Sequence, residues 1–158
     1  MHENFEYADT PLSTNTLKRV SISFNDATTV IIGYNYNAEQ KITQQSVHLD
    51  NHIFIKNYAY TGKRIETISY QKDLTVVGSE QYTYDEVGRI TSDCCTLENV
   101  SHQTTYAYNA KGQLYRENNP LLDKTFIFCY DDIGNISSIE AYDYTTGELG
   151  TPISIQSF

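Results

Sequence analysis

The stretch that decides the fold is QYTYDEVGRITS, residues 81–92. Tyr82 and Tyr84 are two residues apart, so in a strand both rings point to the same face of a sheet. Residues Asp85 and Gly88 are placed as in a type I turn, where the acid bonds the nearby backbone and the glycine accepts a positive φ. A β-branched residue then starts a return strand. The stretch therefore predicts a hairpin closed by a glycine bulge.

The same pattern occurs six times between residues 34 and 149, with copies that begin at residues 34, 58, 82, 106, 128 and 142. Self-similarity at a nearly fixed period indicates a repeat protein. We assign the following residues to the motif in a structural role: Tyr34, Tyr36, Tyr58, Tyr60, Gly62, Tyr82, Tyr84, Asp85, Gly88, Tyr106, Tyr108, Asn109, Gly112, Tyr130, Asp131, Gly134, Tyr142, Tyr144 and Gly147.

The copies differ at the turn. In the first copy Gln40 stands where the glycine is expected, so Gln40 either takes the positive φ itself or distorts the bulge. The turns in residues 60–65 and 144–149 are one residue shorter than the others, which predicts a different turn type there.

About 16 residues separate each Ile or Leu from the next tyrosine pair, enough for two strands and a second turn. The sequence predicts an all-β fold in which antiparallel hairpin repeats of about 24 residues form a curved, open meander of about ten to twelve strands. We expect a partly irregular N-terminal extension over residues 1–20 and a single-domain meander over 21–158. The second turns are expected at Asp50 and Asn51, at Lys72 and Asp73, at Glu98 and Asn99, and at Asn118, Asn119 and Pro120.

Charge and hydropathy exclude several classes of function. The net charge is −9, from 11 basic and 20 acidic residues, which opposes nucleic-acid binding. The longest apolar run, residues 30–32, is too short for membrane insertion. Because no basic start precedes an apolar segment, we expect no signal peptide in this stretch. Residues 151–158 look like a strand that has just begun, so we expect a fragment of a larger chain whose open sheet edges favour homo-oligomers.

Residues with catalytic or metal-binding chemistry are few. His48 and His52 straddle an expected turn, and two histidines are too few for a metal site. Asp131 has a role as a turn former, which weakens a glycosidase pair with the nearby acids. The three cysteines, two of them adjacent, suit free thiols better than a disulfide framework. We therefore expect no enzyme activity, metal or cofactor.

Residues 82–90 and 130–136 resemble the tyrosine-aspartate (YD) repeats of the Rhs family, and residues 116–119 followed by 142–150 resemble the wall-associated Rhs proteins of Gram-positive bacteria. Members of that family wind strands into hollow shells, as in insecticidal toxin complexes and polymorphic toxins, and animal teneurins carry related repeats. The resemblance implies a scaffold or shell wall in a larger secreted or cell-surface protein. Its partners would be the neighbouring repeats of that protein.

Two interpretations of the aromatic residues stay open. In the first, the tyrosine pairs form a structural ladder, with each hydroxyl bonded to water or backbone. In the second, aromatic rings form a platform for glycans, an activity loosely linked to YD repeats. The better candidates for sugar stacking are aromatic residues that the repeat does not require: Phe54, Tyr70, Tyr115 and Phe126.

Overall fold

The computed structural model describes residues 2–7, 16–24 and 28–158 of the 158-residue chain. Of the expected N-terminal extension, residues 1 and 8–15 lie outside this part. The described residues form strands and no helix: β1 (His2–Tyr7), β2 (Leu17–Phe24), β3 (Thr28–Tyr36), β4 (Ile42–Leu49), β5 (His52–Thr61), β6 (Arg64–Lys72), β7 (Thr75–Tyr84), β8 (Ile90–Leu97), β9 (Val100–Tyr108), β10 (Leu114–Asn119), β11 (Lys124–Tyr130), β12 (Ile136–Asp143) and β13 (Ser154–Ser157).

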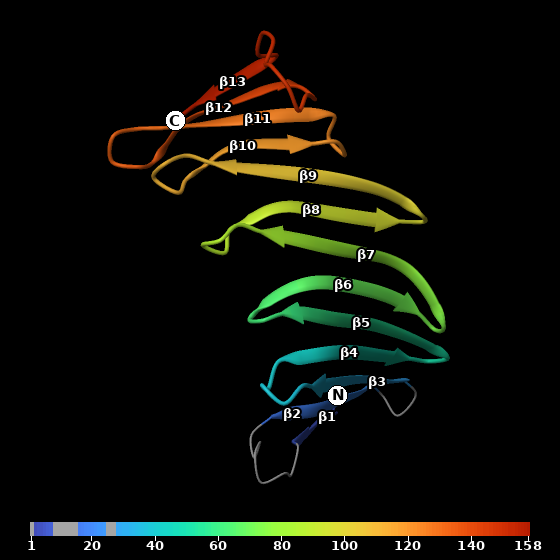
Figure 1. Ribbon diagram of the computed structural model, residues 1–158. Helices are drawn as coiled ribbons and strands as arrows, with labels where there is room; N and C mark the ends of the chain where they lie inside the picture. Colours follow the sequence, from blue (N-terminus) through green and yellow to red (C-terminus); the bar gives the residue numbers. More distant parts are fainter. Residues whose placement is uncertain (1, 8–15, 25–27) are drawn as a thin grey trace. The chain divides into compact units, whose positions relative to one another are not determined.

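The strands are hydrogen-bonded in the order in which they occur in the chain, from β1 to β13 (Figure 1). Neighbours run antiparallel, so the expected all-β open meander is confirmed. The 13 strands of the described residues exceed the expected ten to twelve. The additional strands lie partly in residues 1–20, where β1 and the start of β2 are found.

The chain forms two compact units. The first comprises Met1–Glu80 with Leu97–Asn99, and the second comprises Gln81–Thr96 with Val100–Phe158. Strands β1 to β6 thus belong to the first unit, and β9 to β13 belong to the second.

The longer turns have the geometry expected from their sequence. Gly88 N donates to Asp85 O at 3.0 Å, Asp85 N donates to Arg89 O at 3.0 Å, and the φ of Gly88 is 95°. In the first copy Gln40 makes the same bond to Asn37 with a φ of 62°. Gln40 therefore takes the strained conformation itself, because the hydrogen bonds of the turn hold it there.

The two shorter turns behave differently from each other. Thr61 pairs with Arg64, and the positive φ of 59° falls on Gly62, the first of two central residues, as in a type II′ turn. The second short turn was predicted within residues 144–149, and this prediction is wrong. β12 ends at Asp143, and the chain runs on as a ten-residue loop, 144–153, before β13 begins.

The second turns lie close to their predicted places. Those at Asp50 and Asn51 and at Glu98 and Asn99 are confirmed. The third is shifted by one residue, to 73–74, where Asp73 has a φ of 57°. The fourth covers residues 120–123, because 118–119 continue β10.

Candidate functional site

In the first, second, fourth and fifth copies, the second tyrosine of the motif bonds the first residue of an earlier strand. Tyr60 Oη donates a hydrogen bond of 2.7 Å to the carbonyl of Ile42, the residue that opens the preceding return strand. This is the backbone partner expected for the hydroxyl. The corresponding bonds are Tyr36 to Leu17 at 2.7 Å, Tyr108 to Ile90 at 2.8 Å and Tyr130 to Leu114 at 2.7 Å.

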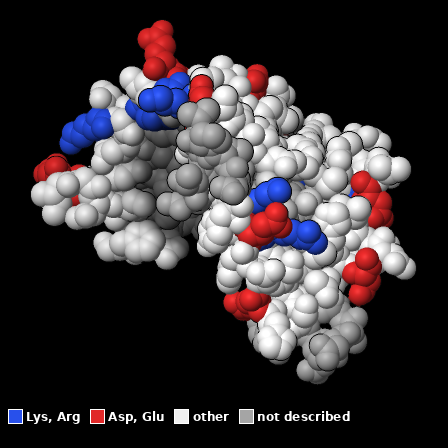
Figure 2. All heavy atoms as spheres, turned by 90° about the horizontal axis from the view of Figure 1, so that it is seen from below, with Lys and Arg blue, Asp and Glu red and all other residues white. Residues whose placement is uncertain are grey.

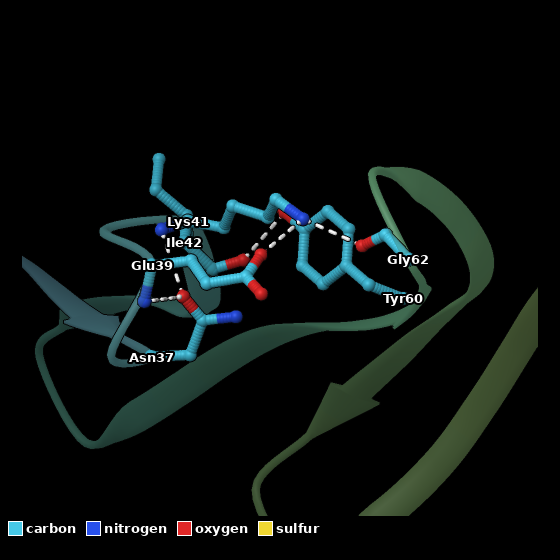
Figure 3. A network of polar contacts seen from close by, with 6 residues as sticks. All are labelled: Asn37, Glu39, Lys41, Ile42, Tyr60 and Gly62. Carbon is cyan, nitrogen blue, oxygen red and sulfur yellow. Dashed lines mark hydrogen bonds and ion pairs between the residues drawn. The ribbon is translucent and has the colours of Figure 1, made fainter.

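A lysine completes the link in the first unit (Figure 3). Lys41 Nζ donates to Gly62 O at 2.6 Å, pairs with Glu39 at 2.6 Å and lies 5.2 Å from the centroid of the Tyr60 ring. The side chain of Asn37 accepts the backbone N–H groups of Glu39 and Lys41, each at 3.0 Å. One turn therefore holds the next turn through an ammonium group and a tyrosine hydroxyl.

Arg89 occupies the position of Lys41 in the second unit. Its guanidinium lies 4.5 Å from the ring centroid of Tyr108, within the range of a cation–π contact. Asp85 accepts the Arg89 backbone N–H at 2.8 Å and the Arg89 Nε–H at 2.7 Å. Burial of Asp85 raises its pKa, but the bonds from Arg89 outweigh this and lower the pKa below its usual value.

The next link of the second unit uses a neutral side chain. Gln113 Nε2 donates to Gly134 O at 3.4 Å, as Lys41 does to Gly62. Asp131 accepts the backbone N–H groups of Asn135 and Ile133 at 2.8 and 3.1 Å. The contact from one turn to the carbonyl of the next is therefore also made where a neutral glutamine takes the place of the lysine.

Phe54 and Tyr70 line one shallow groove of about 290 Å³ in the first unit. Cross-strand pairing places them: Phe54 lies between Val47 and Lys72, and in the adjacent row Lys56 lies between Gln45 and Tyr70. Phe54 is 42% exposed. The residues that line the groove are Gln45, Val47, Phe54, Ile55, Lys56, Tyr70, Gln71 and Val77.

Two ammonium groups lie over the rings of this Phe54–Tyr70 groove. Lys56 Nζ is 5.3 Å from the Tyr70 centroid and 5.4 Å from that of Tyr58, and Lys72 Nζ is 6.0 Å from the Phe54 centroid. Burial lowers the pKa of Lys56, but the two tyrosines have the larger combined effect and raise it. Lys56 is therefore charged at neutral pH.

The hydroxyl of Tyr70 is fixed by a carboxylate. It donates a 2.9 Å hydrogen bond to Glu80 Oε1. Burial and this bond raise the pKa of Tyr70, so the phenol stays protonated. The groove thus has a cationic part at the two lysines and an acidic group beyond the Tyr70 hydroxyl.

Tyr115 and Phe126 belong to the second unit and do not line this groove. Tyr115 is 41% exposed at a bulge of β10, where the register shifts between Leu114 and Arg116. Phe126 is half-buried and lies opposite Glu117. The structure therefore brings together two of the four candidate stacking residues.

A cluster that the sequence did not predict surrounds Arg116. Its Nη2 donates to the carbonyls of Thr145 and Gly147 at 2.8 and 3.0 Å, and its Nε donates to Asn118 at 2.8 Å. The hydroxyl of Thr125, which is fully buried, accepts from Thr145 N at 3.0 Å. We call this cluster the Arg116 clamp.

The Arg116 clamp explains why the sixth copy forms no tight hairpin. The backbone carbonyls of its turn are bound by side chains of β10 and β11. The sequence run at residues 116–119, which also carries the resemblance to wall-associated Rhs proteins, contains two of the clamp's side chains. The loop of the sixth copy could be predicted from the sequence only with the knowledge that residues 116–119 bind a later turn.

The two histidines of the expected β4–β5 turn lie on opposite faces of the sheet. His48 pairs with Ile53, and His52 pairs with Leu49, so their side chains alternate across the ladder. His52 Nδ1 lies 3.2 Å from Asp73 Oδ2. Among the residues that the structure describes, no group of three or more His, Cys, Asp and Glu side chains could hold a metal ion.

The remaining chemical candidates have simpler roles. The bonds from Asn135 lower the pKa of Asp131, whereas a glycosidase acid needs a raised pKa. Cys94, Cys95 and Cys129 are free thiols.

In the described ranges no helix is long and apolar enough to span a bilayer. On the face drawn in Figure 2, acidic and basic side chains are interspersed.

Hairpins joined by tyrosine–carbonyl links define the class of the molecule, a YD-repeat β-meander. Residues 62–150, more than half of the chain, match the family model described as Teneurin YD-shell. The chain belongs to this YD-shell family. No curated protein matches the chain.

Proposed function

We propose that this chain is a wall segment of a shell in a larger bacterial surface or secreted protein of the Rhs type, and that its role there is structural. The family match and the tyrosine–carbonyl links support this proposal. Four such bonds join successive hairpins, and each uses the same motif position. A residue that holds neighbouring repeats together serves the array rather than a ligand.

The links suit a wall because stability in a repeat array comes mainly from interfaces between neighbours. Buried hydrophobic side chains are few among the described residues: they are Ile68 and Tyr142, which are 7% and 8% exposed. A sheet with so little buried apolar surface depends on specific links. Each tyrosine–carbonyl hydrogen bond contributes about 0.5–1.5 kcal/mol.

The proposed partners are neighbouring repeats of the larger protein, at an extracellular or cell-surface location. In isolation the outer strands β1 and β13 would pair edge to edge with other copies. All four residues of β13 are exposed, and Ile155 is 59% exposed.

Light scattering over a range of protein concentration tests the structural proposal. We expect oligomers whose size increases with protein concentration. Ile155→Lys should reduce this size, because a charge on an edge strand opposes pairing. Val87→Lys is the matched control, since Val87 is 74% exposed in a turn between β7 and β8. A chain that stays monomeric at every concentration would contradict edge pairing.

The second function that we propose is glycan binding, and the Phe54–Tyr70 groove favours it. Aromatic and apolar side chains there lie beside amides that can bond sugar hydroxyls. A glycan screen tests it, with Tyr70→Ala expected to lose binding and Tyr115→Ala expected to retain it. Binding that survives Tyr70→Ala would place the site elsewhere.

A further inference from the structure

A second hollow of the first unit lies around Gly33 in β3 and has a volume of about 350 Å³. We call it the Gly33 hollow, and the residues that line it include Glu6, Lys18, Arg19, Gly33, Ser46 and His48. Cross-strand pairing brings them together, because Gly33 lies between Arg19 and Ser46 in the ladder. His48 follows Ser46 by two positions, so it lies on the same face of β4. The hollow shares no lining residue with the Phe54–Tyr70 groove.

The absence of a side chain at Gly33 gives the hollow its depth. A Cβ placed on Gly33 would lie 2.8 Å from Ser46 Oγ, which is closer than Cβ atoms approach other atoms. The hydroxyl of Ser46 therefore lies over the backbone of Gly33. Gly33 is inside a strand and has no positive φ, so the backbone does not require a glycine there. A glycine within a strand often marks a place where a ligand approaches closely.

A β-bulge brings two cations to this hollow. The register of β1 with β2 shifts between Glu6 and Tyr7, which makes Lys18 the extra residue of β2. Adjacent residues of a regular strand point to opposite faces, but a bulge redirects a side chain, and both Lys18 and Arg19 line the hollow. Lys18 Nζ pairs with Glu6 Oε1 at 3.2 Å. One of the two cations is thus neutralised, and the charge of Arg19 remains.

Three side chains of the hollow have donor groups that the protein does not use. Within residues 2–7, 16–24 and 28–158, no hydrogen bond or ion pair engages the guanidinium of Arg19, the hydroxyl of Ser46 or the ring of His48. They come from β2 and β4, on the two sides of Gly33. Unused donors and one uncompensated positive charge around a hollow favour an anion as the ligand.

We propose that the Gly33 hollow binds a phosphate group. The guanidinium of Arg19 donates two parallel hydrogen bonds to two oxygens of an anion. This pair would occupy both oxygens of a carboxylate, whereas a phosphate has further oxygens that accept from Ser46 and His48. The site is independent of the structural and glycan-binding functions proposed above.

A titration followed by the amide NMR signals of the full chain, at constant ionic strength, tests the proposal. The probes are inorganic phosphate, glycerol phosphate and acetate. We expect saturable shifts at Gly33 and Ser46 with phosphate, and about tenfold weaker binding of acetate, which lacks oxygens for two of the donors. Tighter binding of glycerol phosphate than of inorganic phosphate would support a phosphate ester as the ligand, and the reverse would support free phosphate. Acetate that binds as tightly as phosphate would overturn the proposal.

Three variants of the lining change the affinity in different directions. Arg19→Gln should weaken phosphate binding about tenfold, because it removes a charge-assisted pair. Gly33→Ala should also weaken it, because the added Cβ displaces the Ser46 hydroxyl. Glu6→Gln should strengthen it, because it removes a negative charge and releases Lys18. A gain in affinity cannot come from misfolding, so weaker binding in Glu6→Gln would overturn the proposal.

Lys63→Gln is the matched control for Arg19→Gln. It removes one positive charge from the same unit, and Lys63 is exposed in the β5–β6 turn, outside the hollow. Its affinity for phosphate should equal that of the natural chain, with the same strand content by circular dichroism. Equal weakening in Lys63→Gln and Arg19→Gln would show that phosphate responds only to overall charge. That result, or shifts that do not saturate, would overturn the proposal.

Discussion

The fifth and sixth copies of the motif differ in a way that shows what the motif does and does not determine. In the fifth copy Tyr130 bonds the carbonyl of Leu114 and a tight turn follows. In the sixth copy the corresponding residue is Tyr144, which is 37% exposed at the start of a loop, whereas the first tyrosine of that copy, Tyr142, bonds the carboxylate of Glu140. The two copies have similar residue types, but the groups that lie next to them in the folded chain are different.

The difference arises at Arg116. Its guanidinium binds carbonyls 29 and 31 residues further along the chain, within the turn of the sixth copy. A turn whose carbonyls are bound by a side chain no longer pairs them within a hairpin. The motif therefore favours a tight turn, but contacts with residues far away in the sequence determine whether that turn forms.

Arg116→Ala should have the largest effect of the changes considered. It removes three charge-assisted hydrogen bonds and leaves a polar cluster around buried Thr125, so we expect a loss of about 3 kcal/mol in the free energy of unfolding. Urea denaturation measures the loss, and hydrogen exchange should rise first at Gly147.

Lys111→Ala is the control for this change, because Lys111 is exposed in a turn of the same unit. Its stability should stay within about 0.5 kcal/mol of the natural chain. If Arg116→Ala were equally mild, the clamp would not be what holds the loop.

Local chemistry explains which features could be predicted. The turns that contain Asp85, Asn109 and Asp131 follow from an Asx residue and a glycine three positions later, so sequence was sufficient there. The loop of the sixth copy depends on Arg116, and no local pattern reveals a partner so far away. The prediction failed for that reason.

The groove illustrates a second limit. The sequence makes Phe54 and Tyr70 candidates for sugar stacking because the repeat does not require them. Only the register of β5 with β6, which sets Lys56 opposite Tyr70, shows that the two rings share a groove and that ammonium groups cover them. Tyr115 is a candidate for the same reason, yet it lies at a bulge of β10 and not in the groove.

Tyr108→Phe tests one of the tyrosine–carbonyl links. It should lower the free energy of unfolding by about 1 kcal/mol, because it removes one hydroxyl–carbonyl hydrogen bond and keeps the ring under Arg89. Thermal or urea denaturation measures the change. Tyr115→Phe, at an exposed position, should change stability little. Equal effects of the two substitutions would show that the link contributes nothing specific.

Gln40→Gly should stabilise the chain by about 0.5–1 kcal/mol. Gln40 has a φ of 62°, a region that costs a residue with a Cβ about 1–2 kcal/mol, and the greater freedom of glycine in the unfolded chain offsets part of the gain. Gln40→Ala keeps the Cβ and should bring no gain. A Gln40→Gly chain that is less stable than the natural one would mean that the glutamine side chain contributes more than its backbone strain costs.

The smallest effect concerns pH, because the carboxylates involved lie near the surface. Hydrogen bonds from Arg89 hold the pKa of Asp85 below its usual value of about 3.9 despite the opposing effect of burial. A lowered folded-state pKa means that the stabilisation is complete above the unfolded-state pKa and is lost as the pH falls through the folded-state value. Unfolding measured at pH 6 and at pH 3 should show this loss, and Asp85→Asn should make the difference smaller. An unchanged difference in Asp85→Asn would assign the pH dependence to other turns, such as that of Asp131, whose pKa is also lowered.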